Sequence, residues 1–153
     1  MVQNNFYFIK NFTNIYRKPS KLSEVTSQII YGQKFKILLK KKNWIKIKTL
    51  SDNYVGYIKN SYYKQKFTPN YKVNSLKANI FKKPGIKTKI WFTFGSRLAV
   101  IDENGNYVKI ENNKWIKKID IKKISYKEKS FVKIFKKFLN VKYIWGGKTF
   151  NGY

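Results

Sequence analysis

The chain carries one pattern of residues twice, and this internal repeat restricts its fold more than any other feature. Three segments recur in the same order in both halves: 14–19 and 79–84, 31–37 and 94–100, and 44–48 and 107–111. The first segment of each copy ends in a proline, which cannot continue a β-ladder, and the second opens with an aromatic residue and a turn glycine. In a chain of 153 residues, such a period predicts two copies of one small structural unit.

Both copies have the residue pattern of antiparallel β-structure. Polar residues alternate with apolar or aromatic ones in the segments that we expect to form half-buried strands: 34–39, 44–49 and 54–59. Turn-forming residues at 41–43 and 51–53 separate these segments, and the second copy contains Asn104-Gly105, a strong hairpin signal. Short strands joined by tight turns predict a small antiparallel barrel for each copy.

The repeat and the change of pattern after it set the expected domain boundaries. We expect an N-terminal extension, a first barrel, a linker, a second barrel and a C-terminal segment, at residues 1–11, 12–62, 63–71, 72–124 and 125–153. In the last segment, apolar side chains recur every three or four residues and predict an amphipathic helix: Phe131, Ile134, Phe135, Phe138 and Leu139. We expect this apolar face to pack on a core, and a helix lying on a membrane is the alternative.

The formal net charge is +27, and all basic residues except Arg17 and Arg97 are lysines. The positive electrostatic field of such a charge attracts nucleic acid, anionic lipid or an acidic wall polymer, so weak nonspecific binding to polyanions is expected. The explanation that we favour for the charge itself is an A- and T-rich genome. Its codons favour lysine, asparagine, isoleucine, tyrosine and phenylalanine, all of which are abundant in this chain.

Cysteine and histidine are both absent, which excludes disulfides, a thiol nucleophile, an imidazole base and a zinc site built on these residues. With only seven carboxylates, a paired-carboxylate active site is not expected either. We therefore expect no catalytic residue, no metal and no cofactor. The sequence has no signal-peptide pattern and no stretch of about 18 apolar residues. We accordingly expect a monomer without a membrane span, located in the cytoplasm.

Near the C-terminus, Tyr143-Ile144-Trp145-Gly146-Gly147 combines large aromatic side chains with a double glycine. This stretch resembles the start of the NlpC/P60 family of cell-wall cysteine peptidases. In that family a helix leads into Pro-Tyr-x-Trp-Gly-Gly and, after a short spacer, into Asp-Cys-Ser-Gly, which holds the nucleophile. Lys142 stands at the position of the common proline, and residues 148–153 match the spacer. The resemblance implies the start of an α+β catalytic domain.

The two repeats resemble bacterial SH3-like (SH3b) domains. Such domains open with a short strand that ends in proline and continue through a tryptophan-containing strand to a Gly-Tyr-Val/Ile strand. Trp44 and residues 54–58 match these features in the first copy, whereas the second copy has Lys114-Trp115-Ile116 at the last position and matches less closely. The fold class implied is mainly β: two small SH3-like antiparallel barrels, one amphipathic α-helix and a truncated α+β catalytic-domain start.

Tandem SH3b domains followed by an NlpC/P60 domain imply a γ-D-glutamyl-diamino-acid endopeptidase that acts on peptidoglycan stem peptides. Peptidoglycan or a muropeptide is then the expected partner. The first SH3b domain of such proteins can close the N-terminal side of the substrate and bind its free amine. A bound cation needs an acceptor and an aromatic face, so the candidates are Asp52, Tyr54 and Tyr57. The alternative is structural, with Asp52 as a turn former, Tyr54 as an exposed strand residue and Tyr57 in the core.

The resemblance also places Tyr143 and Trp145 at the approach to the cleft, with Gly146 and Gly147 shaping the loop. Trp145 as a simple core anchor is the alternative.

The catalytic part of the resemblance stops short, because this chain holds neither the thiol nor the imidazole of that mechanism. We expect a chain that is inactive alone: a fragment, a frameshifted product, or the N-terminal part of a split protein whose intact parent acts in the periplasm or cell wall. Poor order is expected after about residue 125, with Phe131, Phe135 and Phe138 exposed. The alternative functions are a basic barrel protein that binds nucleic acid or other polyanions, and a protein-interaction scaffold.

Overall fold

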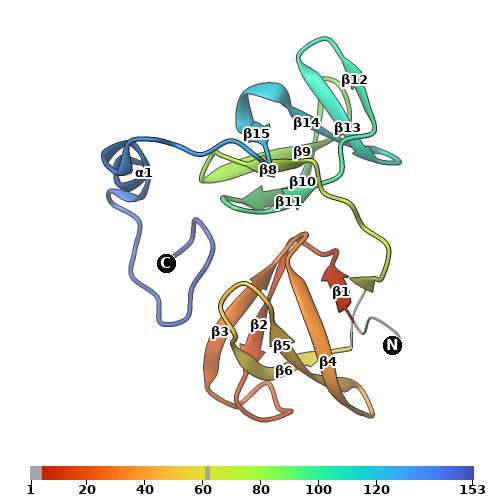
Figure 1. Ribbon diagram of the computed structural model, residues 1–153, viewed down its shortest axis with the longest axis vertical. Coiled ribbons are helices and arrows are strands. Elements are labelled where there is room, and N and C mark those ends of the chain that lie inside the picture. The colour runs from red at the N-terminus through yellow and green to blue at the C-terminus, as the bar shows by residue number, and fades with distance from the viewer. Residues whose placement is uncertain (1–4, 61–62) are drawn as a thin grey trace.

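The first repeat folds into an antiparallel sheet that curls around one hydrophobic core (Figure 1). The computed structural model describes residues 5–60 and 63–153, so residues 1–4 of the expected extension and 61–62 of the expected first barrel lie outside the described part. The strands of this unit, which we call barrel 1, are β1 (Asn5–Phe8), β2 (Phe12–Tyr16), β3 (Val25–Ile30), β4 (Lys34–Lys41), β5 (Trp44–Thr49), β6 (Val55–Lys59) and β7 (Tyr63–Lys64). Their order in the sheet is β3-β2-β6-β5-β4-β1-β7.

The three strands expected from the alternating pattern are confirmed as β4, β5 and β6. In β5, Ile45 and Ile47 are buried in the core, and the lysines that alternate with them lie on the outer face. The turns on either side of β5 contain Lys42 and Asn53, which adopt positive φ angles of 49° and 58°. The period-two pattern therefore gave both the strand positions and the face of each strand that is buried.

Residues 5–8, expected to belong to an extension, form β1 and pair with β4 and β7. Phe8 has no exposed surface, and the rings of Phe6 and Tyr63 meet edge to face with centroids 4.9 Å apart. Complete burial of one such aromatic side chain is worth about 2–3 kcal/mol, which explains why this segment joins the sheet. Barrel 1 therefore starts before residue 12 and takes in the first residues of the expected linker.

The second repeat forms two sheets around a second core, and we call it barrel 2. Its strands are β8 (Tyr71–Val73), β9 (Lys77–Lys83), β10 (Ile86–Thr93), β11 (Arg97–Leu98), β12 (Asp102–Asn104), β13 (Tyr107–Glu111), β14 (Lys114–Lys117) and β15 (Ile121–Lys123), with a 3-10 turn at Lys118–Asp120 before β15. The sheet orders are β10-β9-β14-β13-β12 and β11-β8-β15. The less typical Lys114-Trp115-Ile116 segment forms β14, which pairs with β9 and β13 as β6 pairs with β2 and β5.

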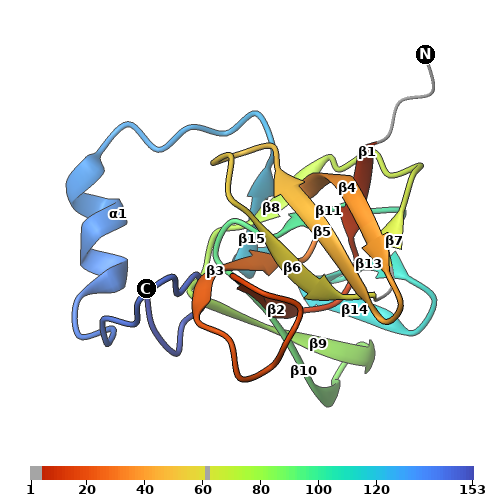
Figure 2. The ribbon, with the colours of Figure 1, turned by 90° about the horizontal axis from the view of Figure 1, so that it is seen from below.

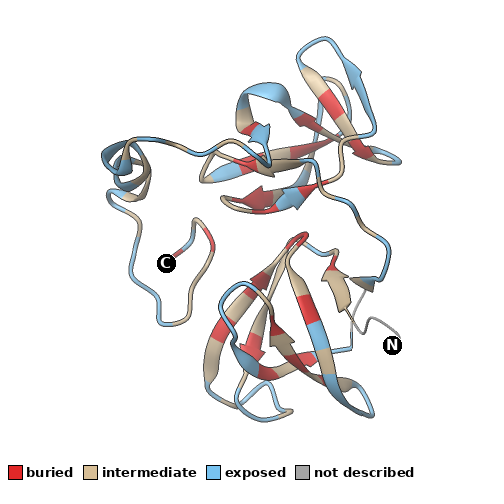
Figure 3. Ribbon diagram, in the orientation of Figure 1, coloured by how far each residue is buried: buried red, intermediate tan, exposed pale blue. Residues whose placement is uncertain are grey.

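One side chain from barrel 1 belongs to the core of barrel 2. Tyr31, in the turn between β3 and β4, is 1% exposed and stacks on Phe92 with ring centroids 4.2 Å apart. The Tyr31 hydroxyl donates to Glu111 Oε1 at 2.5 Å, and the Arg97 N–H donates to the Tyr31 carbonyl at 3.0 Å. Gly32 has a φ of 76°, and a Cβ at this position would collide with the Arg97 backbone. Figure 3 shows this turn as a buried tip that faces barrel 2.

Helix α1 (Phe131–Phe138) projects to one side of the barrels (Figures 1 and 2) and contacts barrel 2 through its last turn, where Lys137 Nζ donates to the Asn74 carbonyl at 2.7 Å. It begins after Ser130, whose hydroxyl accepts a hydrogen bond from the Lys133 N–H. No residue of the helix is buried, and Phe131 and Phe135 are 74% and 69% exposed. The expectation that the apolar face packs on a core is therefore wrong for Phe131 and Phe135, whose expected exposure is confirmed. Phe138, at the end of the same face, packs edge-on against Phe94 with ring centroids 5.3 Å apart. Within the described ranges, no helix is long and apolar enough to cross a membrane.

The tail that follows α1 returns to the seam between the barrels. Phe138, expected to be exposed, packs edge-on against Tyr153 with ring centroids 4.7 Å apart. Phe150 meets Trp91 of β10 edge-on at 4.5 Å, and Trp91 stacks on Phe12 of β2 at 5.4 Å. Where poor order was expected, the structure shows packed side chains, because Phe150 meets Trp91 of barrel 2 and Tyr153 meets Phe138.

Candidate functional site

The tail runs along β3 of barrel 1, and its double glycine permits the close approach. Gly146 has a φ of 71°, and a Cβ there would lie 3.0 Å from the Cα of Ser27. A Cβ on Gly147 would collide with the carbonyl group of Gly152, where the tail folds back on itself. The Lys148 N–H donates to Gln28 Oε1 at 2.8 Å. A larger residue at Gly146 would thus push the tail away from barrel 1, and a larger residue at Gly147 would disrupt the fold of the tail on itself.

Asp52 lies in the turn between β5 and β6, and its carboxylate is held from two sides. Asp52 Oδ1 accepts hydrogen bonds from the hydroxyls of Thr49 (2.5 Å) and Ser51 (3.2 Å), while Oδ2 pairs with Nζ of Lys148 from the tail. Partial burial by itself raises the pKa of Asp52, but the hydrogen bonds from Lys148 and Thr49 outweigh burial and hold the pKa below its usual value. Asp52 is therefore an ionised and oriented acceptor at neutral pH.

The ammonium of Lys148 also contacts Tyr54. Lys148 Nζ lies 5.3 Å from the centre of the Tyr54 ring, within the range of a cation–π interaction. Asp52 and Tyr54 are thus brought together, with one ammonium group between them. Tyr57, the third residue predicted for this site, lies on β6 with Lys46 Nζ 5.8 Å from its ring centre. Tyr57 is half-buried on the outer face of the sheet, which is neither the core position nor a position beside Lys148.

A cavity of about 450 Å³ opens beside Tyr54, between barrel 1 and the tail. Its lining residues come from β3, β5, β6, the loops beside the strands and the tail: Arg17, Glu24, Thr26, Lys46, Tyr54, Val55, Gly56 and Trp145. Trp145 is 67% exposed and closes one side of the cavity, so it is not a core anchor. Tyr143 is 77% exposed and does not line this cavity. Of the two tail aromatics predicted at the cleft, the structure brings only Trp145 to it.

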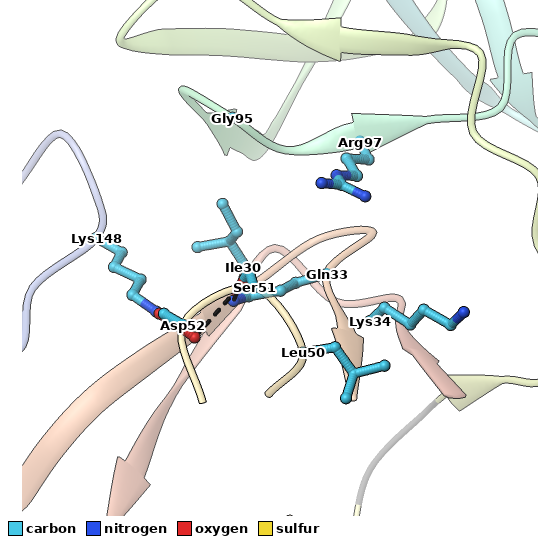
Figure 4. A pocket seen from close by; sticks show the side chains of 9 residues that line it. All are labelled: Ile30, Gln33, Lys34, Leu50, Ser51, Asp52, Gly95, Arg97 and Lys148. Carbon is cyan, nitrogen blue, oxygen red and sulfur yellow. Dashed lines mark hydrogen bonds and ion pairs between the residues drawn. The ribbon is translucent and has the colours of Figure 1, made fainter. Parts of the chain in front are cut away.

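A second cavity, of about 550 Å³, lies between the two barrels (Figure 4). The Asp52–Lys148 pair forms one side of this space, and Arg97 of barrel 2 faces Gln33 and Lys34 of barrel 1 across it. The remaining lining residues are Ile30, Leu50, Ser51 and Gly95. The pair therefore borders one cavity directly, and through Tyr54 it reaches the edge of the other.

Several residues of this site could not be selected from the sequence. Lys148 is one lysine among many, and its partner Asp52 lies 96 positions earlier in the chain. Arg17 and Glu24, which form a 3.1 Å ion pair at the cavity, have no motif or spacing that relates them to the tail. The only signal was indirect, since Glu24 is one of seven carboxylates and Arg17 one of two arginines.

Comparison with known proteins defines the class of the first barrel. Residues 15–61 match the family model of the bacterial dipeptidyl-peptidase SH3 domain, so barrel 1 is a bacterial SH3 (SH3b) domain. Among solved structures, the chain is similar to an NlpC/P60 family protein from Bacillus cereus, with a TM-score of 0.78 and 16% sequence identity. That match covers 97% of this chain and 68% of the other. No curated protein matches the sequence. The chain thus carries an SH3b domain within a fold that it shares with an NlpC/P60 protein.

Proposed function

We propose that the chain is the substrate-gating and wall-binding SH3b portion of a γ-D-glutamyl-diamino-acid endopeptidase that acts on peptidoglycan stem peptides. The chain itself has no thiol nucleophile and no imidazole base, so its own part is recognition. In this proposal, Asp52 and Tyr54 bind the free amino group of the stem peptide, and Trp145 forms a wall of the adjacent cavity. The SH3b match and the NlpC/P60 fold support the class of substrate.

The observation that carries the proposal is the position of the Lys148 ammonium. Asp52 Oδ2 and the face of the Tyr54 ring both contact this one group. A carboxylate held in place by two hydroxyl donors and an adjacent aromatic face are the features that a primary ammonium requires. The cavity of about 450 Å³ beside Tyr54 leaves room for the residues that would follow the amino group in a stem peptide.

Calorimetric titration of the full chain with a stem tripeptide, L-alanyl-γ-D-glutamyl-diaminopimelate, tests this function. The free-amine peptide should bind, and the N-acetylated peptide should bind at least about tenfold more weakly, since a charge-assisted hydrogen bond is lost. Asp52→Asn should remove this preference for the free amine. Asp102→Asn is the matched control, because Asp102 lies on β12 of barrel 2 and should leave the preference unchanged. Equal affinity for the two peptides would contradict the proposed function.

A polyanion-binding function is the second candidate, and the net charge of +27 favours it. Exposed Tyr143 and Trp145 beside numerous lysines supply stacking surfaces and cations, the two elements of sequence-independent binding to single strands. The affinity for a labelled single-stranded RNA should then fall steeply between low and physiological salt. RNA binding that follows this salt dependence and is still measurable at physiological salt, together with no binding to insoluble peptidoglycan, would favour this function over wall recognition.

A further inference from the structure

The Lys148 ammonium occupies the position that the proposed function assigns to the amino group of the substrate. It uses Oδ2 of Asp52, the oxygen that neither Thr49 nor Ser51 contacts, and it lies over the Tyr54 ring. We propose that Lys148 is an internal occupant of the amine site, and that a substrate amine must displace it to bind. This inference rests on the proposed function and adds to it a regulatory contact within the chain.

The tail backbone is held independently of the Lys148 side chain. The Lys148 N–H is bonded to Gln28, and the next residues return through the Thr149–Gly152 bridge. At the end of the tail, the hydroxyl of Tyr153 lies 2.9 Å from Thr93 Oγ1. Because these contacts do not involve the ammonium, the side chain can leave Asp52 while the tail stays on the two barrels. Displacement therefore requires one side chain to change rotamer and does not require the tail to unfold.

The ion pair is accessible enough to be exchanged. The side chains of Lys148 and Asp52 are 23% and 29% exposed, and both border the 550 Å³ cavity between the barrels (Figure 4). A partly exposed ion pair of this kind is weak, so the occupant lowers the affinity for a competing amine by a modest factor, about threefold to tenfold. A tethered ammonium competes at a fixed effective concentration, which lets the site exclude weakly bound amines and admit a ligand with further contacts.

The test compares Lys148→Met, Lys148→Arg and Lys142→Met by calorimetry with the same free-amine and N-acetylated stem tripeptides. Lys148→Met keeps the aliphatic stem but removes the charge, and should bind the free-amine peptide about threefold to tenfold more tightly than the wild type. Lys148→Arg keeps the cation and should bind like the wild type. Lys142→Met removes a lysine from the same tail that has no side-chain contact with Asp52, and should also bind like the wild type. Hydrogen exchange of residues 144–152 verifies that the tail stays in place.

The outcomes separate this inference from the function on which it rests. If Lys148→Met binds the free-amine peptide no more tightly than Lys142→Met, while both still discriminate against the acetylated peptide, the inference that Lys148 occupies the amine site is refuted. The proposed function stands in that case. If none of the proteins discriminates between the peptides, the proposed function fails and the inference fails with it. Tighter binding by Lys148→Met alone, confined to the free-amine peptide, supports both.

Discussion

Replacing Tyr31 with phenylalanine should weaken the docking of the two barrels without disturbing either core. The ring would still stack on Phe92, so the packing is preserved, and the loss is confined to the hydrogen bond from the hydroxyl to Glu111. Hydrogen bonds to a charged acceptor contribute about 1.5–3 kcal/mol. Glu111 keeps its ion pair with Lys114 at 2.9 Å, so the carboxylate is not left without a partner. We expect the free energy of unfolding to fall by about 2 kcal/mol.

Urea unfolding followed by circular dichroism and by tryptophan fluorescence measures this loss. For a chain of this size, about 2 kcal/mol corresponds to a decrease in Tm of about 4–8 °C. Tyr16→Phe is the matched control, because its ring is half-buried against Trp44 and its hydroxyl has no hydrogen-bond partner among the described residues. The control should change the free energy of unfolding by less than about 0.5 kcal/mol. If Tyr31→Phe is as stable as Tyr16→Phe, the bond to Glu111 does not contribute to docking and the reasoning is refuted.

Three further predictions concern pH and the tail. Burial and the bond to Glu111 raise the pKa of Tyr31, so the contribution of its hydroxyl to stability is complete below the unfolded pKa of about 10 and declines above it. The difference in free energy of unfolding between wild type and Tyr31→Phe should therefore become smaller when urea unfolding is repeated at alkaline pH. The pKa of Asp52 is lowered, so its pairing with Lys148 should persist above the unfolded pKa of about 4 and weaken below it, visible as a shift of the Lys148 amide resonance that is absent in Asp52→Asn. Gly146→Ala should raise hydrogen exchange in residues 144–152 but not around Trp115, because alanine at this positive φ costs about 1 kcal/mol and its Cβ would meet β3. Unchanged exchange in residues 144–152 would argue against the packing of the tail on β3.

The strands were the most predictable part of the fold, because a half-buried strand alternates apolar residues on its buried face with polar residues on its exposed face. The pattern around Ile45 and Ile47 located β5 to the residue, and the Asn104-Gly105 pair located the turn between β12 and β13. The N-terminal strand β1 was missed, since Phe8 lies in the run of aromatic and apolar residues 6–9, which has no alternation. Its assignment to barrel 1 depends on the tertiary pairing with β4, which local pattern does not encode.

Only part of the candidate site was predictable from the sequence. Asp52 and Tyr54 follow from the turn and strand of the SH3b pattern, and Gly146 from the double glycine. The contact that joins them is made by Lys148, and a pairing between residues 96 positions apart leaves no trace in a single lysine-rich sequence. For the apolar face of α1, both packing on a core and exposure of Phe131 and Phe135 were expected, because an amphipathic period states that a face is apolar and not whether another segment covers it.

The insertion of Tyr31 into the neighbouring core has a consequence for exchanging domains between proteins that carry SH3b barrels. A domain swap that cuts the chain between the two repeats separates the Tyr31 side chain from the core of barrel 2 in which it is buried. Barrel 1 on its own would expose the Tyr31 ring to solvent, and barrel 2 on its own would have a cavity next to Phe92. Chimaeras that move the two repeats as one cassette, or that transplant the Tyr31-Gly32 hairpin with its receiving surface, avoid both defects.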